Sequence, residues 1–221
     1  MICPSILSAD FSLLKETFQE MEKAGIEVIH FDVMDNHFVP NLTFGHKFVS
    51  DLRKHSALFF DVHLMIHKPE VHFRHYLEAG ADLIVIHYEA VDPSQIRKVS
   101  EEIRKKGKKF GISIKPATPV NVLLPFLEYL DLILIMTVEP GFGGQKLIEP
   151  CVEKVAELKK MIHDSSLKII LQVDGGVDKD NLERIYHRGA DWFVVGSAFF
   201  KEPDFTFFQK LLKRIQTNVT I

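Results

Sequence analysis

The stretch LFFDVHLMIHKPEVHFRHYLEAGADLIVIH, residues 58–87, contains one complete unit of the pattern that decides the fold. A short apolar run at 58–65 predicts a strand, an amphipathic run at 69–79 predicts a helix, and an apolar run at 83–87 predicts the next strand. A proline suits the first turn of this helix and a glycine suits its end. This order predicts two parallel strands joined by a right-handed crossover.

The same alternation continues through the whole chain. Strands are predicted at residues 2–8, 27–33, 58–65, 83–87, 109–114, 132–137, 168–174 and 192–196. Helices are predicted between them, among others at residues 11–24, 69–79, 93–106, 147–163 and 179–187. Eight units of roughly 28 residues predict an α/β fold, a single (β/α)8 TIM barrel with a parallel eight-stranded core, in which residues 1–221 form one domain. An open doubly wound sheet is the alternative, but its first turn is usually glycine-rich, and residues 7–10 contain no glycine.

Composition and charge disfavour several other classes of protein. The 221 residues are 46% hydrophobic and 26% charged, and the formal net charge of −3 gives no electrostatic footprint for nucleic acid. No apolar stretch reaches the roughly 18 residues that a membrane span needs, and the N-terminal residues lack a signal-peptide pattern. Cys3 and Cys151 are too few for a disulfide framework and are expected to be buried or half-buried. We therefore expect a cytoplasmic protein with no nucleic-acid or membrane partner.

Polar side chains stand at strand positions where a barrel normally has Val, Ile or Leu. Alternate residues of a strand share a face, so His30 and Asp32 point the same way, as do Asp61 and His63. Converging His and Asp side chains predict a site for one divalent metal ion (Zn, Fe, Mn or Co), formed by His30, Asp32, His63 and Asp174. A hydrogen-bonded polar layer without metal is the alternative. Asp61 is expected to orient one of the imidazoles.

Glycine-rich turns follow the last three predicted strands. Backbone N–H groups exposed at glycine can approach a phosphate, and barrels often bind phosphate at the loops after strands seven and eight. A tight turn is the alternative for any single pair, but three adjacent loops together favour a phosphate site. Its predicted members are Gly141, Phe142, Gly143, Gly144, Gly175, Gly176, Gly196 and Ser197.

Three methionines, Met34, Met65 and Met136, end predicted strands and face the same mouth if the alternation holds. Flexible core filling is one interpretation of these residues. A polarizable, water-poor lining around a carbanion-like intermediate is the other. His87 ends the fourth predicted strand, where it could lie near a ligand without binding metal.

Several longer motifs resemble the ribulose-phosphate 3-epimerase family. They follow the family's order over nearly the whole chain: PSILSADF (4–11), HFDVMD (30–35), HFVPN (37–41), DVHLM (61–65), KPATP (115–119), MTVEPGFGGQ (136–145), VDGGV (173–177) and GSA (196–198). The resemblance implies interconversion of D-ribulose 5-phosphate and D-xylulose 5-phosphate at C3, in the pentose phosphate pathway. It also implies a small phosphorylated ketose as substrate and a homo-oligomeric enzyme.

The resemblance assigns roles to individual residues. Asp32 and Asp174 are implied to be the acid/base pair, one on each face of C3, which exchange protons through a planar cis-enediolate. The metal, held by both aspartates with His30 and His63, is implied to stabilise that enediolate as a Lewis acid. Ser5, His63 and Asp174 are implied to contact the substrate. The glycine loops are implied to hold its phosphate and the three methionines to surround the enediolate.

One position departs from the family pattern. Asn36 stands where the family usually has Gly, in the segment MDNHFVPN at residues 34–41. Asn is the non-glycine residue that best tolerates a left-handed backbone, so we expect the turn to persist.

Three other functions share part of these features. A 3-epimerase of hexulose 6-phosphates resembles the same family, and a metal-dependent hydrolase would use the metal to activate water. A phosphosugar-binding protein without catalysis is the third. Turnover, proton exchange at C3 and the choice of substrate distinguish the four functions.

Overall fold

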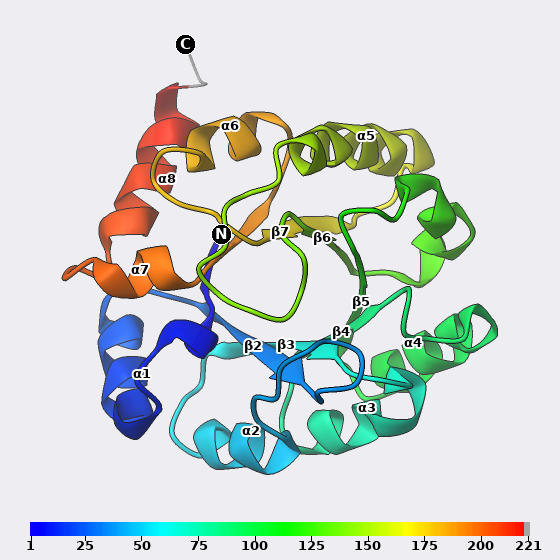
Figure 1. The fold of residues 1–221 in the computed structure, drawn as a ribbon, viewed down its shortest axis with the longest axis horizontal. Coiled ribbons are helices and arrows are strands. Elements are labelled where there is room, and N and C mark those ends of the chain that lie inside the picture. The colour runs from blue at the N-terminus through cyan, green and yellow to red at the C-terminus, as the bar shows by residue number, and fades with distance from the viewer. Residues whose placement is uncertain (219–221) are drawn as a thin grey trace.

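A parallel eight-stranded sheet closes into a barrel in the computed structural model, which describes residues 1–218 (Figure 1). The strands are β1 Ile2–Pro4, β2 Val28–Met34, β3 Phe59–Met65, β4 Leu83–His87, β5 Lys109–Ile114, β6 Leu132–Met136, β7 Ile170–Asp174 and β8 Trp192–Val195. Their hydrogen-bonded order is β1-β8-β7-β6-β5-β4-β3-β2, and every pair is parallel. One parallel bridge between Ser5 and His30 joins β1 to β2. The predicted barrel is therefore confirmed.

Helices surround the strands as an outer ring (Figure 1). They are α1 Leu14–Lys23, α2 His46–Arg53, α3 Pro69–Glu78, α4 Ile96–Lys105, the 3-10 helix η4 Val120–Tyr129, α5 Pro150–Ser165, α6 Leu182–His187, α7 Ser197–Lys201 and α8 Phe207–Asn218. Short 3-10 turns, η1 Ile6–Ser8, η2 Phe11–Leu13 and η3 Pro93–Gln95, lie between these elements. Within residues 1–218, no helix has the length and apolar character that crossing a membrane requires.

The first strand is shorter than predicted. The sequence predicted a strand over 2–8, but β1 ends at Pro4 and the chain then forms a 3-10 turn. Ser5 causes this turn because its hydroxyl accepts the N–H of Leu7 at 3.3 Å, which competes with continuation of the strand. The turn carries the following residues out of the sheet and leaves Ser5 at the barrel mouth.

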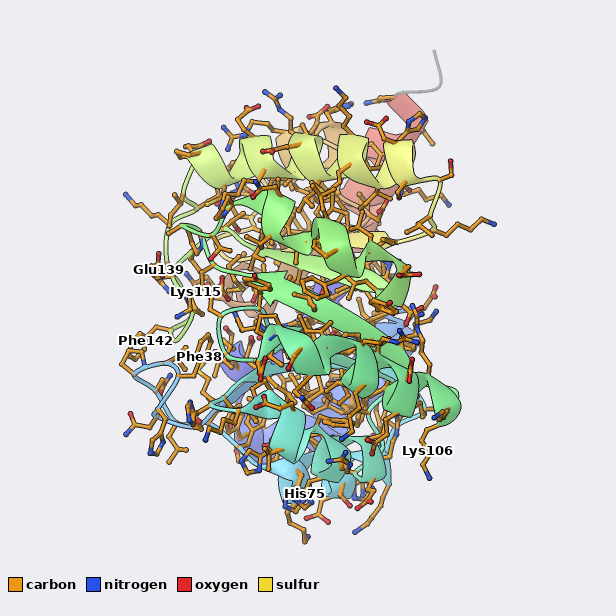
Figure 2. All side chains as sticks on the ribbon, turned by 90° about the vertical axis from the view of Figure 1, so that its right-hand side faces the viewer. Phe38, His75, Lys106, Lys115, Glu139 and Phe142 are labelled. Carbon is orange, nitrogen blue, oxygen red and sulfur yellow. The ribbon has the colours of Figure 1, made fainter. Side chains whose placement is uncertain are left out.

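Two apolar layers hold the strands in place. Outward-facing side chains such as Phe31, Phe60 and Phe193 are fully buried against the helices. Leu83, Val85, Leu132 and Leu134 belong to a separate cluster that fills the barrel interior. Towards the C-terminal ends of the strands the interior becomes polar, with buried His and Asp side chains. The site therefore lies above a packed apolar plug, at the end of the barrel where Phe38, Lys115, Glu139 and Phe142 are labelled in Figure 2.

Three aspartates stabilise the opposite end of the barrel in the same way. Asp82, Asp131 and Asp191 each precede a strand and accept the N–H of a residue in a strand next to it, at 2.9 Å in all three cases. Each also pairs with a basic side chain from an earlier helix: Arg53 at 3.0 Å, Arg104 at 3.1 Å and Lys159 at 2.8 Å. These aspartates join helix, turn and strand far from the polar mouth.

Replacing Asp131 by Ala is expected to lower the free energy of unfolding by about 1–3 kcal/mol, because the Phe110 N–H loses its carboxylate acceptor. The pair with Arg104 adds little, since both side chains are partly exposed. Urea unfolding followed by circular dichroism measures the change. Asp180→Ala is the matched control, because that carboxylate pairs with Lys179 on the surface and its loss should leave the midpoint unchanged. Equal midpoints for Asp131→Ala and the original chain would contradict this role.

Candidate active site

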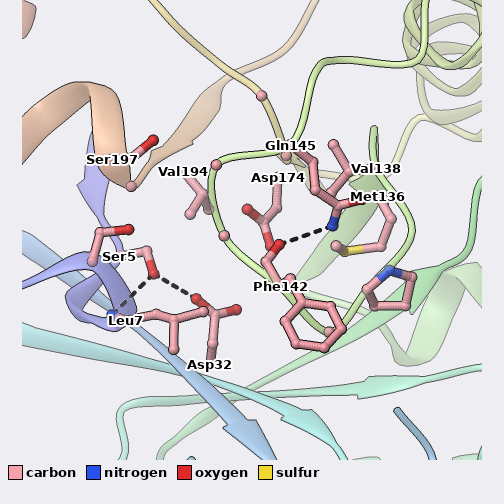
Figure 3. A pocket seen from close by; sticks show the side chains of 18 of the residues that line it. Ser5, Leu7, Asp32, Met136, Val138, Phe142, Gln145, Asp174, Val194 and Ser197 are labelled. Atoms are coloured by element: carbon pink, nitrogen blue, oxygen red, sulfur yellow. Dashed lines mark hydrogen bonds between the residues drawn. The ribbon is translucent and has the colours of Figure 1, made fainter. Parts of the chain in front are cut away.

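A pocket opens at the C-terminal ends of the strands and contains most of the predicted site residues (Figure 3). Ser5 and Asp32 line it from one part of the barrel, and Asp174 lines it from β7. The three predicted methionines and the glycine loops also line it: Met34, Met65, Met136, Gly141, Phe142, Gly143, Gly144, Gly175, Gly176, Gly196 and Ser197. Residues predicted from separate segments therefore surround one space, as the strand alternation required.

Two histidines lie beneath this pocket, in contact with its two aspartates. His30 and His63 are fully buried. His30 Nε2 is 3.3 Å from Asp32 Oδ1 and 3.9 Å from Asp174 Oδ2. His63 Nδ1 is 3.5 Å and 3.9 Å from the same two oxygens. One donor atom from each of the four residues thus lies within 4.8 Å of the others, which is the spacing expected around a single ion.

The two imidazole nitrogens that face this cluster lack a hydrogen-bond partner. Among the described residues, buried His30 Nε2 and His63 Nδ1 form no hydrogen bond of acceptable geometry. Leaving a buried polar nitrogen unsatisfied costs about 1–3 kcal/mol, and a metal ion would satisfy both. Two imidazoles and two carboxylates are a common donor set for zinc and related divalent ions. The residues present therefore fit a divalent metal better than a closed polar layer.

The pKa shifts of the cluster also favour a bound cation. Burial raises the pKa of Asp174 to about 7, and the nearby charge of Asp32 adds to that rise. Burial opposes ionisation of Asp32 as well, but His30 and His63 outweigh it and lower its pKa. Burial lowers the pKa of His30, yet Asp61 and Asp32 raise it well above the usual range. Buried carboxylates at this distance repel one another, so a cation among them would stabilise the arrangement.

His30 is oriented by a carboxylate on its other side. Its Nδ1 lies 2.7 Å from Asp61 Oδ2, so the contact expected for Asp61 is present. Gln172 Nε2 donates to the same oxygen at 2.7 Å. Asp61 and Gln172 are both fully buried in the barrel interior. A carboxylate on the far nitrogen of an imidazole fixes the ring and its tautomer, so Nε2 is the nitrogen that His30 presents to the cluster.

His63 is oriented through a contact that the sequence did not reveal. Its Nε2 lies 2.9 Å from His87 Nε2, and His87 Nδ1 lies 3.2 Å from Glu89 Oε2. His87 is fully buried, and burial lowers its pKa to about 4. Burial raises the pKa of Glu89, but hydrogen bonds from His87 and from the segment after β5 outweigh it and lower the pKa to about 2. His87 therefore lies behind a predicted ligand and outside the ligand cluster.

The glycine loops adopt backbone conformations that side chains would disturb. Gly175 and Gly176 both have positive φ, +120° and +67°. A Cβ on Gly175 would lie 2.5 Å from Val138, and one on Gly176 would lie 2.4 Å from the Leu147 backbone N. Glycine is therefore required for the loop after β7 to pack against the loop after β6. This contact brings the predicted phosphate-binding segments together.

The loops after β2 and β6 meet above the pocket. Asn41 Nδ2 donates to the carbonyl of Gly141 at 2.7 Å, across 100 residues of sequence. Asn36 has φ 57°, so the turn adopts the left-handed backbone that was expected at this position. Phe142, in the second of these loops, stays more than half exposed at 55%. The pocket is therefore partly covered by segments from different parts of the barrel.

The three methionines form much of the apolar surface beside the aspartates. Met34, Met65 and Met136 are almost fully buried, with 3%, 1% and 2% exposed. Met34 and Met65 pack together with Val39, and Met136 packs with the interior cluster. They line the pocket as predicted, and they exclude water from the side of the cluster that they cover. Cys3 and Cys151 are buried and unpaired, which agrees with the expectation from composition.

Comparison with known proteins identifies the family. The model of the ribulose-phosphate 3 epimerase family matches residues 1–200. This chain belongs to the ribulose-phosphate 3-epimerase family. Ribulose-phosphate 3-epimerase of Bacillus subtilis is 41% identical over 204 residues, covering 92% of this chain and 93% of the relative. The protein of that name from Treponema pallidum is 44% identical over 199 residues, covering 90% of each.

A solved structure outside this epimerase family shares the fold. The 3-keto-L-gulonate-6-phosphate decarboxylase of Vibrio cholerae superposes with a TM-score of 0.70 at 16% identity, covering 98% of this chain and 97% of that one. At this identity the likeness concerns the barrel alone. The predicted resemblance to the epimerase enzymes is confirmed by the family match and the two relatives.

Gly176→Ala is expected to destabilise the protein, by about 1–2 kcal/mol from the left-handed backbone alone. The clash with the Leu147 backbone adds to this cost, because neither segment can move without separating the two loops. Thermal and urea unfolding measure the change. Gly45→Ala is the matched control, since its φ is −99° and, apart from Gly45 and the residues on either side of it, no described atom lies within 4 Å of the added Cβ. Similar stability of both variants would show that the loop contact is not rigid.

Proposed function

We propose that this chain interconverts D-ribulose 5-phosphate and D-xylulose 5-phosphate by metal-assisted epimerisation at C3. Membership of the epimerase family supports the reaction, and the arrangement of charged groups in the pocket supports the chemistry. The observation that carries the proposal is a pair of carboxylates, Asp32 and Asp174, in one pocket beside two buried imidazole nitrogens that have no hydrogen-bond partner in the described part of the chain. In a polar layer without metal, both of these buried nitrogens would stay without a hydrogen-bond partner.

The two aspartates are proposed to move the proton at C3. They come from β2 and β7, so a ligand lying between them would present a different face to each carboxylate (Figure 3). One aspartate removes the proton and the other returns a proton to the opposite face, which inverts the carbon. Each exchanges roles when the reaction runs backward, and a planar cis-enediolate connects the two halves.

Ser5 orients the carboxylate of Asp32 through a hydrogen bond. The Ser5 hydroxyl donates to Asp32 Oδ2 at 2.5 Å, while Oδ1 faces His30 and His63. Both carboxylate oxygens therefore have fixed surroundings. Ser5 also stands at the bridge that joins β1 to β2, so the closure of the barrel positions the hydroxyl.

His30, Asp32, His63 and Asp174 are proposed to hold one divalent ion. When bound there, the ion supplies Lewis-acid stabilisation of the negative charge that develops on the substrate oxygens. The ligand set suits zinc, iron, manganese or cobalt.

The remaining pocket residues are proposed to bind and shield the substrate. Backbone N–H groups of the loops at Gly143–Gly144, Gly175–Gly176 and Gly196–Ser197 are suited to a phosphate, which would fix C3 relative to the aspartates. Met34, Met65 and Met136 would keep water away from the carbanion-like intermediate. A homo-oligomeric state and a cytoplasmic location stay predictions from the sequence.

Solvent-deuterium incorporation at C3 of ribulose 5-phosphate tests the proposal. The metal-reconstituted protein should incorporate deuterium and form xylulose 5-phosphate. Asp32→Asn and Asp174→Asn should each lower the rate by about 10²–10⁴-fold, because an amide cannot accept or return the proton. Asp180→Asn changes an exposed carboxylate between β7 and α6 and should retain full activity.

Other outcomes would contradict the proposal in distinct ways. Absence of exchange with every metal form would exclude this substrate, and hexulose 6-phosphates would then be assayed under the same conditions. Turnover that consumes water without C3 exchange would indicate a hydrolase. Ribulose 5-phosphate binding without any turnover would indicate a binding protein.

A further inference from the structure

The contact between His63 and His87 has no role in the reaction as proposed above. Two imidazole nitrogens face each other at 2.9 Å, and both rings are fully buried. Nor does the mechanism use the KPATP segment at residues 115–119, although this segment contacts Glu89 at the far end of the same chain of hydrogen bonds. His63, His87, Glu89 and this segment therefore form one connected polar path that leads away from the ligand cluster.

Hydrogen-bond directions along this path are fixed from its outer end. Glu89 Oε2 can only accept, so His87 Nδ1 carries the proton between them. A neutral His87 then has a bare Nε2, which needs a donor, and His63 Nε2 is the donor that faces it. A neutral His63 with its proton on Nε2 has a bare Nδ1. That bare nitrogen is the one that faces Asp32 and Asp174.

We propose that Glu89, acting through His87, is a positioning residue that fixes the tautomer of His63 and keeps Nδ1 free to bind a divalent ion. The inference rests on the proposed metal site and extends it beyond the four ligands. Asp61 fixes the orientation of His30 in the same way, but by direct contact with its Nδ1. Glu89 acts on His63 through the intervening ring of His87, because this carboxylate lies in the turn that follows β4, the strand next to β3.

The segment after β5 holds Glu89 in its acceptor role. The backbone N–H of Lys115 donates to Glu89 Oε1 at 2.8 Å, and the hydroxyl of Thr118 donates to the same oxygen. Lys154, from α5, donates to the carbonyls of Pro116 and Thr118 at 2.5 and 2.6 Å, which holds the segment against the barrel. The backbone donor cannot turn away or reverse. Glu89 must therefore always present an acceptor at Oε1.

Phe38 covers the middle of this path. Its ring centroid lies 4.8 Å from that of His87, and Lys115 Nζ lies 4.1 Å from the centre of the Phe38 ring. Figure 2 shows Phe38 and Lys115 together at the end of the barrel that carries the pocket. The covered ring of His87 is shielded from water, so its hydrogen-bond partners are His63 and Glu89 and its tautomer follows theirs.

The isosteric change Glu89→Gln should reverse every bond on this path. The fixed Lys115 N–H requires an oxygen at the Oε1 position, so the amide NH2 must face His87. His87 Nδ1 then becomes the acceptor and its proton moves to Nε2. His63 must in turn accept on Nε2 and carry its proton on Nδ1, which blocks the nitrogen that faces the ligand cluster.

Two measurements on the full chain test the proposal. Competition with a chromophoric chelator gives the Kd for Zn²⁺, and we expect Glu89→Gln to raise it by about 10–100-fold. Long-range 1H–15N spectra of the zinc-free protein give the tautomer of His63, assigned by its loss in His63→Gln. We expect Nε2–H in the original chain and Nδ1–H in Glu89→Gln.

Two matched variants separate this role from general packing or charge. Thr118→Val removes a rotatable donor to Glu89 and leaves the carboxylate and the backbone donor, so the Kd and the tautomer should stay close to those of the original chain. Glu149→Gln removes one exposed negative charge and should also change neither. Melting temperatures of all variants verify that each is folded.

The outcomes distinguish failure of this inference from failure of the proposed function. An unchanged His63 tautomer in folded Glu89→Gln, or an unchanged Kd, would overturn the inference. A reversed tautomer in a chain that binds no divalent ion would support the inference on tautomer control and overturn the metal site. Equal weakening of zinc binding by Thr118→Val and Glu89→Gln would show a packing effect and would also overturn it.

Discussion

His30 Nε2 and His63 Nδ1 face the same pair of carboxylates at the mouth of the barrel, and neither nitrogen has a hydrogen-bond partner within residues 1–218. Leaving two buried nitrogens without a hydrogen-bond partner is costly unless a ligand binds them. Asp61 fixes one ring directly, and Glu89 fixes the other through His87. The carboxylates of Asp61 and Glu89 thus determine which nitrogen each imidazole presents to the ligand cluster.

The cluster of buried His and Asp side chains and the groups that stabilise the fold lie at opposite ends of the barrel. At the far end, Asp82, Asp131 and Asp191 hold strand N–H groups and pair with basic side chains of the helices. Between the two ends lies the apolar interior cluster of leucines and valines. Strand ends at the C-terminal face can therefore carry charged side chains and open loops while the other face maintains the barrel. Ser5 connects the two requirements, because it closes the ring and also orients Asp32.

Strand alternation predicted much of this site from the sequence. The period of two placed His30 with Asp32 and Asp61 with His63, and the structure brings these residues and Asp174 together. The link from His63 to Glu89 escaped prediction because it depends on a neighbouring ring from β4 and on a turn after β5, and neither follows from alternation within one strand. Local chemistry explains the other differences. The Ser5 side chain ended the first strand early, and η4 lacks a clear helical pattern because it contains Pro125 and is largely apolar.

Equilibrium dialysis against Zn²⁺ and Mn²⁺, with the bound metal counted by mass spectrometry, tests whether the four-residue cluster holds a divalent ion. We expect one ion per chain, and we expect it to be lost in His30→Gln because the cluster then lacks one of its two imidazoles. His72→Gln, which changes an exposed histidine on α3, should bind the ion as the original chain does. Failure of the original chain to bind either ion, or full binding by His30→Gln, would show that these four residues do not form a metal site.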